Sequence, residues 1–562
     1  MIRVPVLLLV LNTSFPPASA EPPPADCESA LCRLLVSDSL PSLRWPNFAD
    51  YKAQIQNSYQ QSGYTFLWTR AGRLTEQARA VIEALQESDT KGLNSEDYDG
   101  PRWTDRLLGL KDAANPSTEA TLAEFDLALT ISTMRYISDL QFGRANPGLF
   151  RDASDIESEE FDLASFLPER LAHAIDAKAA LEGIEPPYQG YRRTEQALQH
   201  YIAMAREDHV GLLPVTKKAI EPGGSYAALA QLAERLRLLG DLPGNVSVPL
   251  DLSIYSGPLV DAVKHFQARH GLDPDGRIGK ATFAQINTPL SHRVLQLQLT
   301  LERWRWMPHG FPQPPIVINI PEFELRATND SYRTELQMKV VVGAAYRHQT
   351  PAFLAYLKEV VFRPYWNVPL SIQRAELVPK LDRDAAYLMK NRYEVVTPQN
   401  TFVSNGAVDQ ATLAQLRSGT LRLRQIPGPE NALGLVAFRF PNQHDVYLHG
   451  TPAAQLFEKS RRDFSHGCIR AEKPQQLAEW VMRNQPEWTP ERIAEAMNGE
   501  NTIHVGLKKP IPVLIVYASA VALESGEVRF FEDIYGQDAA LAKTLDSRGK
   551  PTSAGRGPRQ RE

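Results

Sequence analysis

Cysteine is scarce in this chain, which has only three in 562 residues. A dense disulfide framework, of the kind that stabilises small secreted domains, is therefore excluded. The chain also lacks a basic excess: 61 Lys and Arg stand against 66 Asp and Glu, for a formal net charge of -5 and a pI near 6.2. Nucleic-acid binding usually needs a basic surface, so we expect no nucleic-acid partner.

Long hydrophobic runs are missing as well. The apolar run Val4–Leu11 is shorter than the roughly 20 residues that span a bilayer. Arg3 precedes it and three small residues follow at positions 18–20, the pattern of a secretory signal peptide with its cleavage site. We therefore expect a signal peptide over 1–20, an N-terminal linker over 21–44 and no membrane span after cleavage.

The three cysteines are unevenly placed. Cys27 and Cys32 lie close together after the signal, whereas Cys468 stands alone. An exported chain can oxidise the first pair, so we hypothesise a disulfide between Cys27 and Cys32, which a titration with DTNB finding three free thiols would contradict. Cys468 is then an unpaired thiol that is either buried and inert or kept for its reactivity.

The length implies about three or four domains. Residues 45–240 read as amphipathic helices and are predicted to form a helical scaffold. The apolar spacing predicts one helix over Thr75–Leu85 and another from Ser225, as N-cap, to Gly240, as C-cap. The region contains no cluster of residues with metal-binding or catalytic spacing, which favours a structural role.

Residues 255–288 form a helix, turn, helix unit. An apolar stripe of Leu259, Val263 and Phe266 precedes Gly271, and a second helix begins near Lys280. The strings AVKHFQ (262–267), GLDPDG (271–276) and IGKAT (278–282) resemble the peptidoglycan-binding domain of cell-wall enzymes. The resemblance implies a small three-helix module over 241–290 that binds peptidoglycan glycan; no metal site is expected in it.

Beyond a predicted helical connector at 291–314, the pattern changes to β. β-branched runs predict strands, and a polar helical pattern at 370–425 predicts a helical insertion within a mostly-β domain spanning 315–540. The expected strands are 316–320, 338–342, 359–362, 436–440 and 445–448, with a final hairpin from 512–517 and the turn near 525–526. The Gly-, Pro- and Arg-rich segment 541–562 is predicted to be a disordered tail. The fold class is thus multidomain α+β.

A candidate catalytic group lies in this β-rich region. Cys468 follows Ser465, His466 and Gly467, and His449 lies 19 positions upstream. A nearby imidazole can take the thiol proton and leave a reactive thiolate-imidazolium pair, and a glycine beside the nucleophile lets backbone amides face an oxyanion. Gly467 suits that oxyanion role. Spacing alone leaves open which histidine is the base.

The segment resembles the L,D-transpeptidase (YkuD-type) motif, in which a His-Gly pair precedes a Ser/Thr-His-Gly-Cys string. The resemblance implies that Cys468 is the nucleophile and His449 the general base. It also implies that the Gly450 carbonyl orients His449 and that His466 shapes the nucleophile loop. A structural cysteine with two incidental histidines would not account for the full string.

Further residues are assigned to substrate binding by the same resemblance. Arg470 would contact a substrate carboxylate or form an ion pair that fixes the loop. Tyr447 would lie beside the active site, although it also fits an ordinary strand aromatic. Ser465 belongs to the motif. Trp366, in the string PYWNVP, would line the groove for the acyl donor.

Over residues 45–540 the chain resembles large periplasmic L,D-transpeptidases, with a capping subdomain inserted in the catalytic domain. The resemblance implies a periplasmic enzyme without cofactor that forms 3-3 crosslinks between peptidoglycan stem peptides. It would do so through a Cys468 thioester with release of terminal D-Ala, and carbapenem-type β-lactams would acylate it. The alternatives are an L,D-carboxypeptidase, a lipoprotein-attaching transpeptidase, a catalytically silent wall-binding scaffold and a general cysteine protease.

Overall fold

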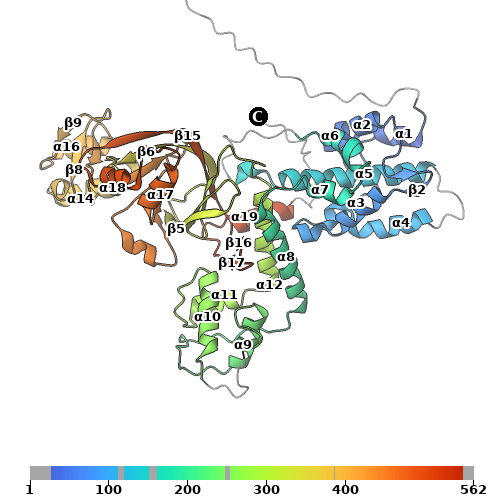
Figure 1. Ribbon diagram of the computed structural model, residues 1–562, viewed down its shortest axis with the longest axis horizontal. Coiled ribbons are helices and arrows are strands. Elements are labelled where there is room, and N and C mark those ends of the chain that lie inside the picture. The colour runs from blue at the N-terminus through green and yellow to red at the C-terminus, as the bar shows by residue number, and fades with distance from the viewer. Residues whose placement is uncertain (1–26, 112–118, 151–160, 247–253, 385, 548–562) are drawn as a thin grey trace, which may run out of the picture. The chain divides into compact units, whose positions relative to one another are not determined.

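The computed structural model describes residues 27–111, 119–150, 161–246, 254–384 and 386–547. The predicted signal peptide and residues 548–562 of the predicted tail lie outside the described residues. The chain forms two compact units, whose elements are labelled in Figure 1. The first comprises Met1–Arg144, Glu159–Pro186 and Asp546–Glu562, and the second comprises Ala145–Ser158 and Pro187–Leu545. The predicted scaffold of 45–240 is therefore divided between the two units.

Helices dominate the first unit. They are α1 (Ala30–Val36), α2 (Lys52–Gln61), α3 (Glu76–Gln86), α4 (Trp103–Lys111), α5 (Glu119–Phe142), α6 (Leu163–Ser165) and α7 (Ala177–Glu182), with a short hairpin of β1 (Thr69–Arg70) and β2 (Arg73–Leu74). The predicted helix at 75–85 is confirmed as α3. The Thr75 hydroxyl caps it by accepting from Ala78 N, and its predicted apolar face is buried.

Helix α5 forms the core of this unit. Most of its side chains are buried, as expected for a helix that is apolar on all sides. Asp126 on α5 is fully buried, and its carboxylate accepts hydrogen bonds from Leu67 N, Trp68 N and the Tyr59 hydroxyl at 2.8–3.0 Å. These bonds satisfy a charge that would otherwise be costly to bury.

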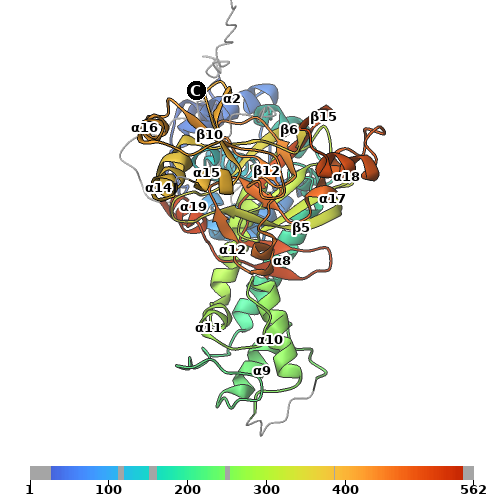
Figure 2. The ribbon, with the colours of Figure 1, turned by 90° about the vertical axis from the view of Figure 1, so that its left-hand side faces the viewer.

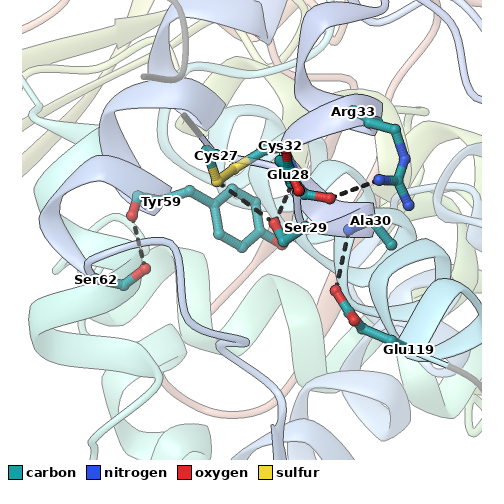
Figure 3. Close-up of a disulfide and its surroundings, with 9 residues drawn as sticks. All are labelled: Cys27, Glu28, Ser29, Ala30, Cys32, Arg33, Tyr59, Ser62 and Glu119. Carbon is teal, nitrogen blue, oxygen red and sulfur yellow. Dashed lines mark hydrogen bonds between the residues drawn. A yellow bond between two sulfur atoms is a disulfide. The ribbon is translucent and has the colours of Figure 1, made fainter. Parts of the chain in front are cut away.

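The predicted N-terminal linker is partly wrong, because α1 lies within it. Leu31 and Leu35 of α1 are each 1 % exposed, and Glu119 of α5 accepts from Ala30 N at 3.0 Å. Two apolar residues one helical turn apart create a buried face, so the segment folds onto the core. The structure joins Cys27 and Cys32 by a disulfide at the start of α1, with their Cα atoms 6.0 Å apart (Figure 3).

Two long helices pack together in the second unit. α8 (Gln189–Glu207) packs against α12 (Leu290–Trp304) through a shared core that includes Tyr191, Leu198 and Leu297. Between them in the sequence are three shorter helices, α9 (Leu229–Leu238), α10 (Pro258–Arg269) and α11 (Lys280–Ile286), which lie together in Figures 1 and 2.

These three helices form the small module predicted from the sequence. Val263 and Phe266 of α10 are buried together with Leu232 of α9 and Phe283 of α11. The module therefore begins before the predicted boundary at 241. The predicted N-cap at Ser225 is also wrong: Ser225 instead forms a β-bridge with Ile254, and the helix begins four residues later.

The β-rich region of the second unit is a nine-stranded sheet. Its strands are β3 (Ile316–Asn319), β4 (Glu324–Thr328), β5 (Thr334–Gly343), β6 (Phe353–Phe362), β11 (Val436–Arg439), β12 (Leu448–His449), β13 (Asp463–Ser465), β14 (Ile469–Ala471) and β15 (Ile503–Val516). Their order is β13-β5-β14-β12-β11-β6-β15-β3-β4, and β4 also pairs with β5. This last pairing closes the sheet on itself around a buried apolar core, with α17 (Pro474–Val481) and α18 (Pro490–Asn498) packed against it.

The insertion in this sheet is not purely helical as predicted. It contains a four-stranded antiparallel sheet, ordered β7-β10-β8-β9, together with helical segments. The strands are β7 (Trp366–Asn367), β8 (Tyr393–Val396), β9 (Phe402–Ser404) and β10 (Arg422–Gln425), and the helices are α13 (Leu370–Ile372), η7 (Gln373–Leu377), α14 (Val378–Arg383), α15 (Tyr387–Lys390) and α16 (Gln410–Ser418). We call residues 366–425 the cap; it has an apolar core of its own.

The end of the second unit differs from the prediction in two details. The predicted strand at 512–517 belongs to the long β15, and the hairpin is formed instead by β16 (Ala520–Ala522) and β17 (Val528–Phe530) around the predicted turn. Helix α19 (Gln537–Ser547) extends into the predicted tail, because Leu541 is fully buried there.

Candidate active site

Two short parallel strands bring the motif residues together. In the register of β12 and β14, Leu448 lies opposite Ile469, and His449 lies opposite Arg470. Leu448 and Ile469 are fully buried in the barrel core, a burial that stabilises each by about 1.5–3 kcal/mol. Because neighbouring residues of a strand face opposite sides, His449 and Arg470 share the other face.

The same alternation places Tyr447 and Cys468 beside them. Tyr447 lies two residues before His449, and Cys468 lies two residues before Arg470. Ile469 N donates to Tyr447 O at 3.0 Å, which continues the parallel ladder. The rings of Tyr447 and His449 lie 5.7 Å apart. Sheet geometry therefore gathers the predicted nucleophile, the predicted base and two predicted substrate-binding residues on one face.

His449 is held as a neutral imidazole. Its Nδ1 donates to the carbonyl oxygen of Gly450 at 2.5 Å, and a carbonyl can only accept, so Nδ1 carries the proton and Nε2 is left as an acceptor. Burial, together with the charge of Arg470, lowers the pKa of His449 to about 3. The contact with Gly450 is the one expected of the residue that orients the base.

Cys468 is half-buried and protonated. Its thiol donates to Asp445 O over 3.6 Å. Burial raises the pKa of Cys468 above its usual value, and hydrogen bonds from Tyr447 oppose the shift only in part. A neutral thiol beside a neutral imidazole differs from the thiolate-imidazolium pair expected from the sequence. A neutral imidazole can accept a thiol proton as the sulfur attacks a carbonyl, which is the role predicted for His449.

The turn that carries the nucleophile, residues 465–468, is bonded internally. The Ser465 hydroxyl donates to Cys468 O at 2.5 Å and accepts from Gly467 N at 3.2 Å. Thr350 donates from Oγ1 to Gly467 O at 2.7 Å and accepts from Gly343 N at 2.8 Å. Gly467 has φ +114°, a conformation that is strained for any residue with a side chain. We call this segment the nucleophile turn.

These bonds change two of the predicted roles. Ser465 is 3 % exposed, and its hydroxyl is hydrogen-bonded within the turn. The hydroxyl therefore shapes the backbone rather than facing a substrate. The N–H of Gly467 is donated to Ser465, so it is not free to bind an oxyanion. No hydrogen bond in the described part of the chain uses the N–H of Cys468, which is the better candidate for that role.

Arg470 has no carboxylate partner among the described residues, and its Nε is buried without a hydrogen bond there. The ion pair that would fix the loop is therefore not formed. Burial lowers the pKa of Arg470, and the charge of a Cys468 thiolate would oppose that shift. An unpaired guanidinium on the same face as the predicted nucleophile favours a contact with a substrate carboxylate.

The remaining two predicted site residues lie towards the cap. His466 is exposed, and its Nε2 lies 2.5 Å from Glu376 Oε1 of the cap, while its ring is 4.6 Å from that of His348. Trp366 is half-buried in β7, where its ring packs against Tyr393 at 6.3 Å. The structure thus makes Trp366 part of the cap's own packing, and its place in a substrate groove stays a prediction.

Three residues that contact the site were not predicted from the sequence. Thr350 lies between β5 and β6, where no local pattern indicates its bonds to Gly343 and to the nucleophile turn. Asp445, at φ +52°, bends the chain just before β12 and supplies the carbonyl near the thiol. Glu376 lies 90 positions from His466 in a polar helical stretch, where no local pattern marks it.

No group of three or more His, Cys, Asp or Glu side chains in the described ranges could hold a metal ion. None of the helices there is both long enough and apolar enough to cross a membrane.

Comparison with known families identifies three domains. The L,D-transpeptidase catalytic domain family (YkuD) matches residues 314–505, a scaffold domain matches 53–198, and a "putative peptidoglycan binding domain" matches 225–286. A protein of Haemophilus influenzae named "putative L,D-transpeptidase" is 31 % identical over 226 residues. That alignment covers 40 % of this chain and 45 % of the relative, so the chain spans under half of the relative's length.

Among solved structures, the L,D-transpeptidase (residues 123–326) of Xylanimonas cellulosilytica matches at 15 % identity over 54 % of this chain and 100 % of that one. Its TM-score of 0.16 is too low to support any statement about the fold. The family matches carry the assignment: this chain contains a YkuD-type L,D-transpeptidase catalytic domain, together with a scaffold domain and a putative peptidoglycan-binding domain.

Proposed function

We propose that this protein is a periplasmic L,D-transpeptidase that forms 3-3 crosslinks between peptidoglycan stem peptides, with Cys468 as nucleophile and His449 as general base. The observation that carries the proposal is the parallel register of β12 and β14, which sets Tyr447, His449, Cys468 and Arg470 on one face of the barrel. The three-domain set supports peptidoglycan as the substrate.

In the first step Cys468 attacks a stem-peptide carbonyl. His449 Nε2 takes the thiol proton as the sulfur bonds to the carbonyl carbon of diaminopimelate at position three of a tetrapeptide stem. The C–N bond to the terminal D-Ala then breaks, and His449 returns the proton to the leaving amine. D-Ala departs, and a thioester to Cys468 remains.

In the second step an amine resolves the thioester. The side-chain amine of a second diaminopimelate attacks the thioester carbon, loses a proton to His449 and forms the crosslink, while the sulfur leaves and recovers a proton. Water in place of the amine would give a tripeptide, the product of an L,D-carboxypeptidase. The neutral state of His449 is the one that both attacks require.

Arg470 and the N–H of Cys468 complete the site. The unpaired Arg470 would bind the carboxylate of the acyl donor, and the Cys468 N–H would donate to the oxyanion of each tetrahedral intermediate. Because the same thiol would attack a strained β-lactam carbonyl, carbapenems are expected to acylate Cys468.

The test is mass spectrometry of disaccharide-tetrapeptides incubated with the mature protein. The proposal predicts dimers with the mass of two tetrapeptides less one D-Ala, formed by wild type and absent with Cys468→Ala and His449→Ala. Tripeptide alone would indicate the carboxypeptidase. Unchanged substrate would contradict the proposal and favour the wall-binding scaffold.

A further inference from the structure

We propose that Glu376, a residue of the cap, is a positioning residue for the nucleophile turn. Its carboxylate holds the His466 imidazole, so the placement of Cys468 for attack on a stem peptide depends on the cap being seated. The inference rests on the proposed function, because the transpeptidase reaction supplies one of its readouts. A second readout does not depend on activity.

The contact joins two parts of the chain that are distant in sequence. His466 Nε2 lies 2.5 Å from Glu376 Oε1, and the side chains are 35 % and 40 % exposed. On its other side the His466 ring lies 4.6 Å from His348, at a tilt of 45°. The imidazole is thus held between the cap and the loop that follows β5.

Glu376 belongs to a segment that is fixed within the cap. It lies on η7, where the neighbouring Gln373 is fully buried. The Gln373 amide donates to Leu416 O at 2.7 Å and to Leu421 O at 3.1 Å, and its oxygen accepts from Leu423 N at 2.8 Å. These bonds tie η7 to α16 and β10, so Glu376 is carried rigidly by the cap.

The residues on both sides of Glu376 strengthen this attachment. Arg374 donates to the carbonyl oxygens of Arg417 and Ser418, each at 2.7 Å, and Leu377 is buried in the cap core. A rigid-body movement of the cap would therefore carry Glu376 away from His466.

His466 is the member of the nucleophile turn that reaches the cap. Ser465 is engaged inside the turn, Gly467 has no side chain, and Cys468 faces the site. A hydrogen bond between two partly exposed side chains is a weak interaction. Such a contact can open and close readily, as a site that must admit two stem peptides in turn requires.

The first experiment compares Glu376→Ala with Asp382→Ala. Asp382 is the matched control, because it is a cap carboxylate of similar exposure, paired with Arg417 at 3.3 Å, and no described contact joins it to the nucleophile turn. For D-Ala release from the tetrapeptide we expect Glu376→Ala to lower kcat about three- to tenfold with little change in KM. Asp382→Ala should match wild type, and Glu376→Gln, which keeps a hydrogen-bond acceptor, should recover part of the loss.

Two further measurements separate positioning from loss of structure. Alkylation of Cys468 by iodoacetamide should keep its wild-type rate in Glu376→Ala, because a small reagent does not need the placement set by the cap. The double variant Glu376→Ala, His466→Ala should lose no more activity than either single variant, as expected for two residues acting as one pair.

Hydrogen exchange supplies the readout that does not depend on activity. In Glu376→Ala the amides of Gly467 and Ala344, which bond to Ser465, should exchange faster than in Asp382→Ala, while α14 of the cap should be unchanged. If wild type released no D-Ala, the proposed function would fail and exchange alone would decide the inference. Equal exchange and equal kcat in the two variants would overturn it, and so would faster exchange throughout the cap.

Discussion

At the scale of single residues, the site is set by what burial does to two titratable groups. His449 is 5 % exposed and neutral, and Cys468 keeps its proton because desolvation outweighs the hydrogen bonds from Tyr447. The sequence motif pointed to both residues but could not give their protonation states. The pKa of a side chain depends on its packing in the folded protein, which a motif does not contain. The resting site therefore holds a thiol rather than a thiolate.

This protonation state predicts how Cys468 reacts with iodoacetamide as the pH changes. Because the folded protein raises the pKa of the thiol, the thiolate forms only as the pH rises above the ordinary range near 8.5. The alkylation rate should climb steadily through pH 7–9, with no plateau at lower pH. Glutathione under the same conditions serves as the reference. A rate that stayed constant from pH 5 to 7 would indicate a preformed thiolate-imidazolium pair.

At the scale of elements, the nucleophile turn depends on a backbone shape that only glycine adopts easily. Gly467, at φ +114°, lets the turn close between β13 and β14. The sequence predicted β3 and β11 but only half of β5 and the last four residues of β6, because β-branched runs are local signals. It missed β7 to β10, since short strands within a polar stretch are specified by their packing on the cap core rather than by local pattern.

Gly467→Ala tests this element. A side chain at this backbone conformation costs about 1–3 kcal/mol, so the turn should distort and transpeptidation should fall together with thermal stability. Gly506→Ala is the matched control, because Gly506 lies in β15 and no atom lies within 4 Å of the Cβ that alanine would add. Both are checked by melting temperature and by the rate of D-Ala release. Equal behaviour of the two variants would mean that the turn does not require glycine.

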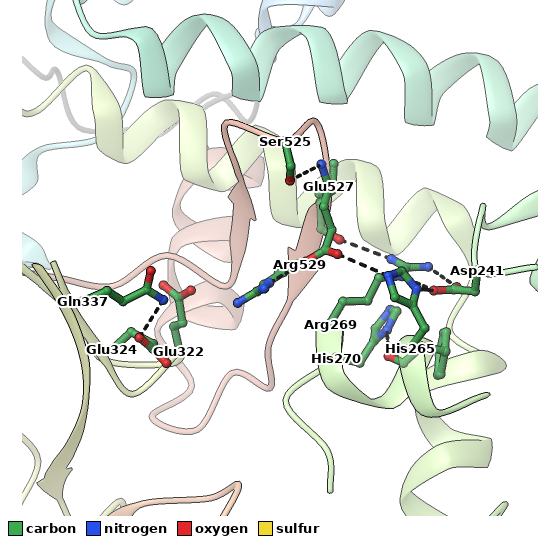
Figure 4. Close-up of polar contacts among 12 residues, drawn as sticks. Asp241, His265, Arg269, His270, Glu322, Glu324, Gln337, Ser525, Glu527 and Arg529 are labelled. Carbon is green, nitrogen blue, oxygen red and sulfur yellow. Dashed lines mark hydrogen bonds and ion pairs between the residues drawn. The ribbon is translucent and has the colours of Figure 1, made fainter. Parts of the chain in front are cut away.

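At the scale of the whole second unit, a buried ion pair helps to hold the peptidoglycan-binding module on the hairpin of β16 and β17. Arg269 donates to both oxygens of Asp241 at 2.5–2.6 Å and to Val528 O at 3.2 Å, and His265 lies between Asp241 and Glu527 (Figure 4). The sequence motif placed the helices of the module. It could not reveal this attachment to the hairpin, because Glu527 and Val528 lie more than 250 positions after His265 and Arg269.

Asp241→Asn should therefore destabilise the module. Removing one partner leaves the buried Arg269 charge uncompensated, at a cost of about 3–5 kcal/mol. Glu221→Gln breaks a fully exposed pair with Arg277 and should leave stability almost unchanged. Calorimetry should show a clearly lower melting transition only for Asp241→Asn. A similar small shift in both variants would show that the pair at Asp241 contributes little.

The central claim is that Cys468, activated by His449, carries the acyl group. The most direct test is mass spectrometry of the intact protein after brief exposure to a tetrapeptide donor, with the modified residue located by digestion. The account predicts an adduct equal to the stem less D-Ala on Cys468. Cys468→Ala should form none, and His449→Ala should form it about 10²–10⁴-fold more slowly. His504→Ala, an exposed histidine on β15 paired with Glu359, should match wild type. An adduct on another residue, or one formed at the wild-type rate in His449→Ala, would contradict the account.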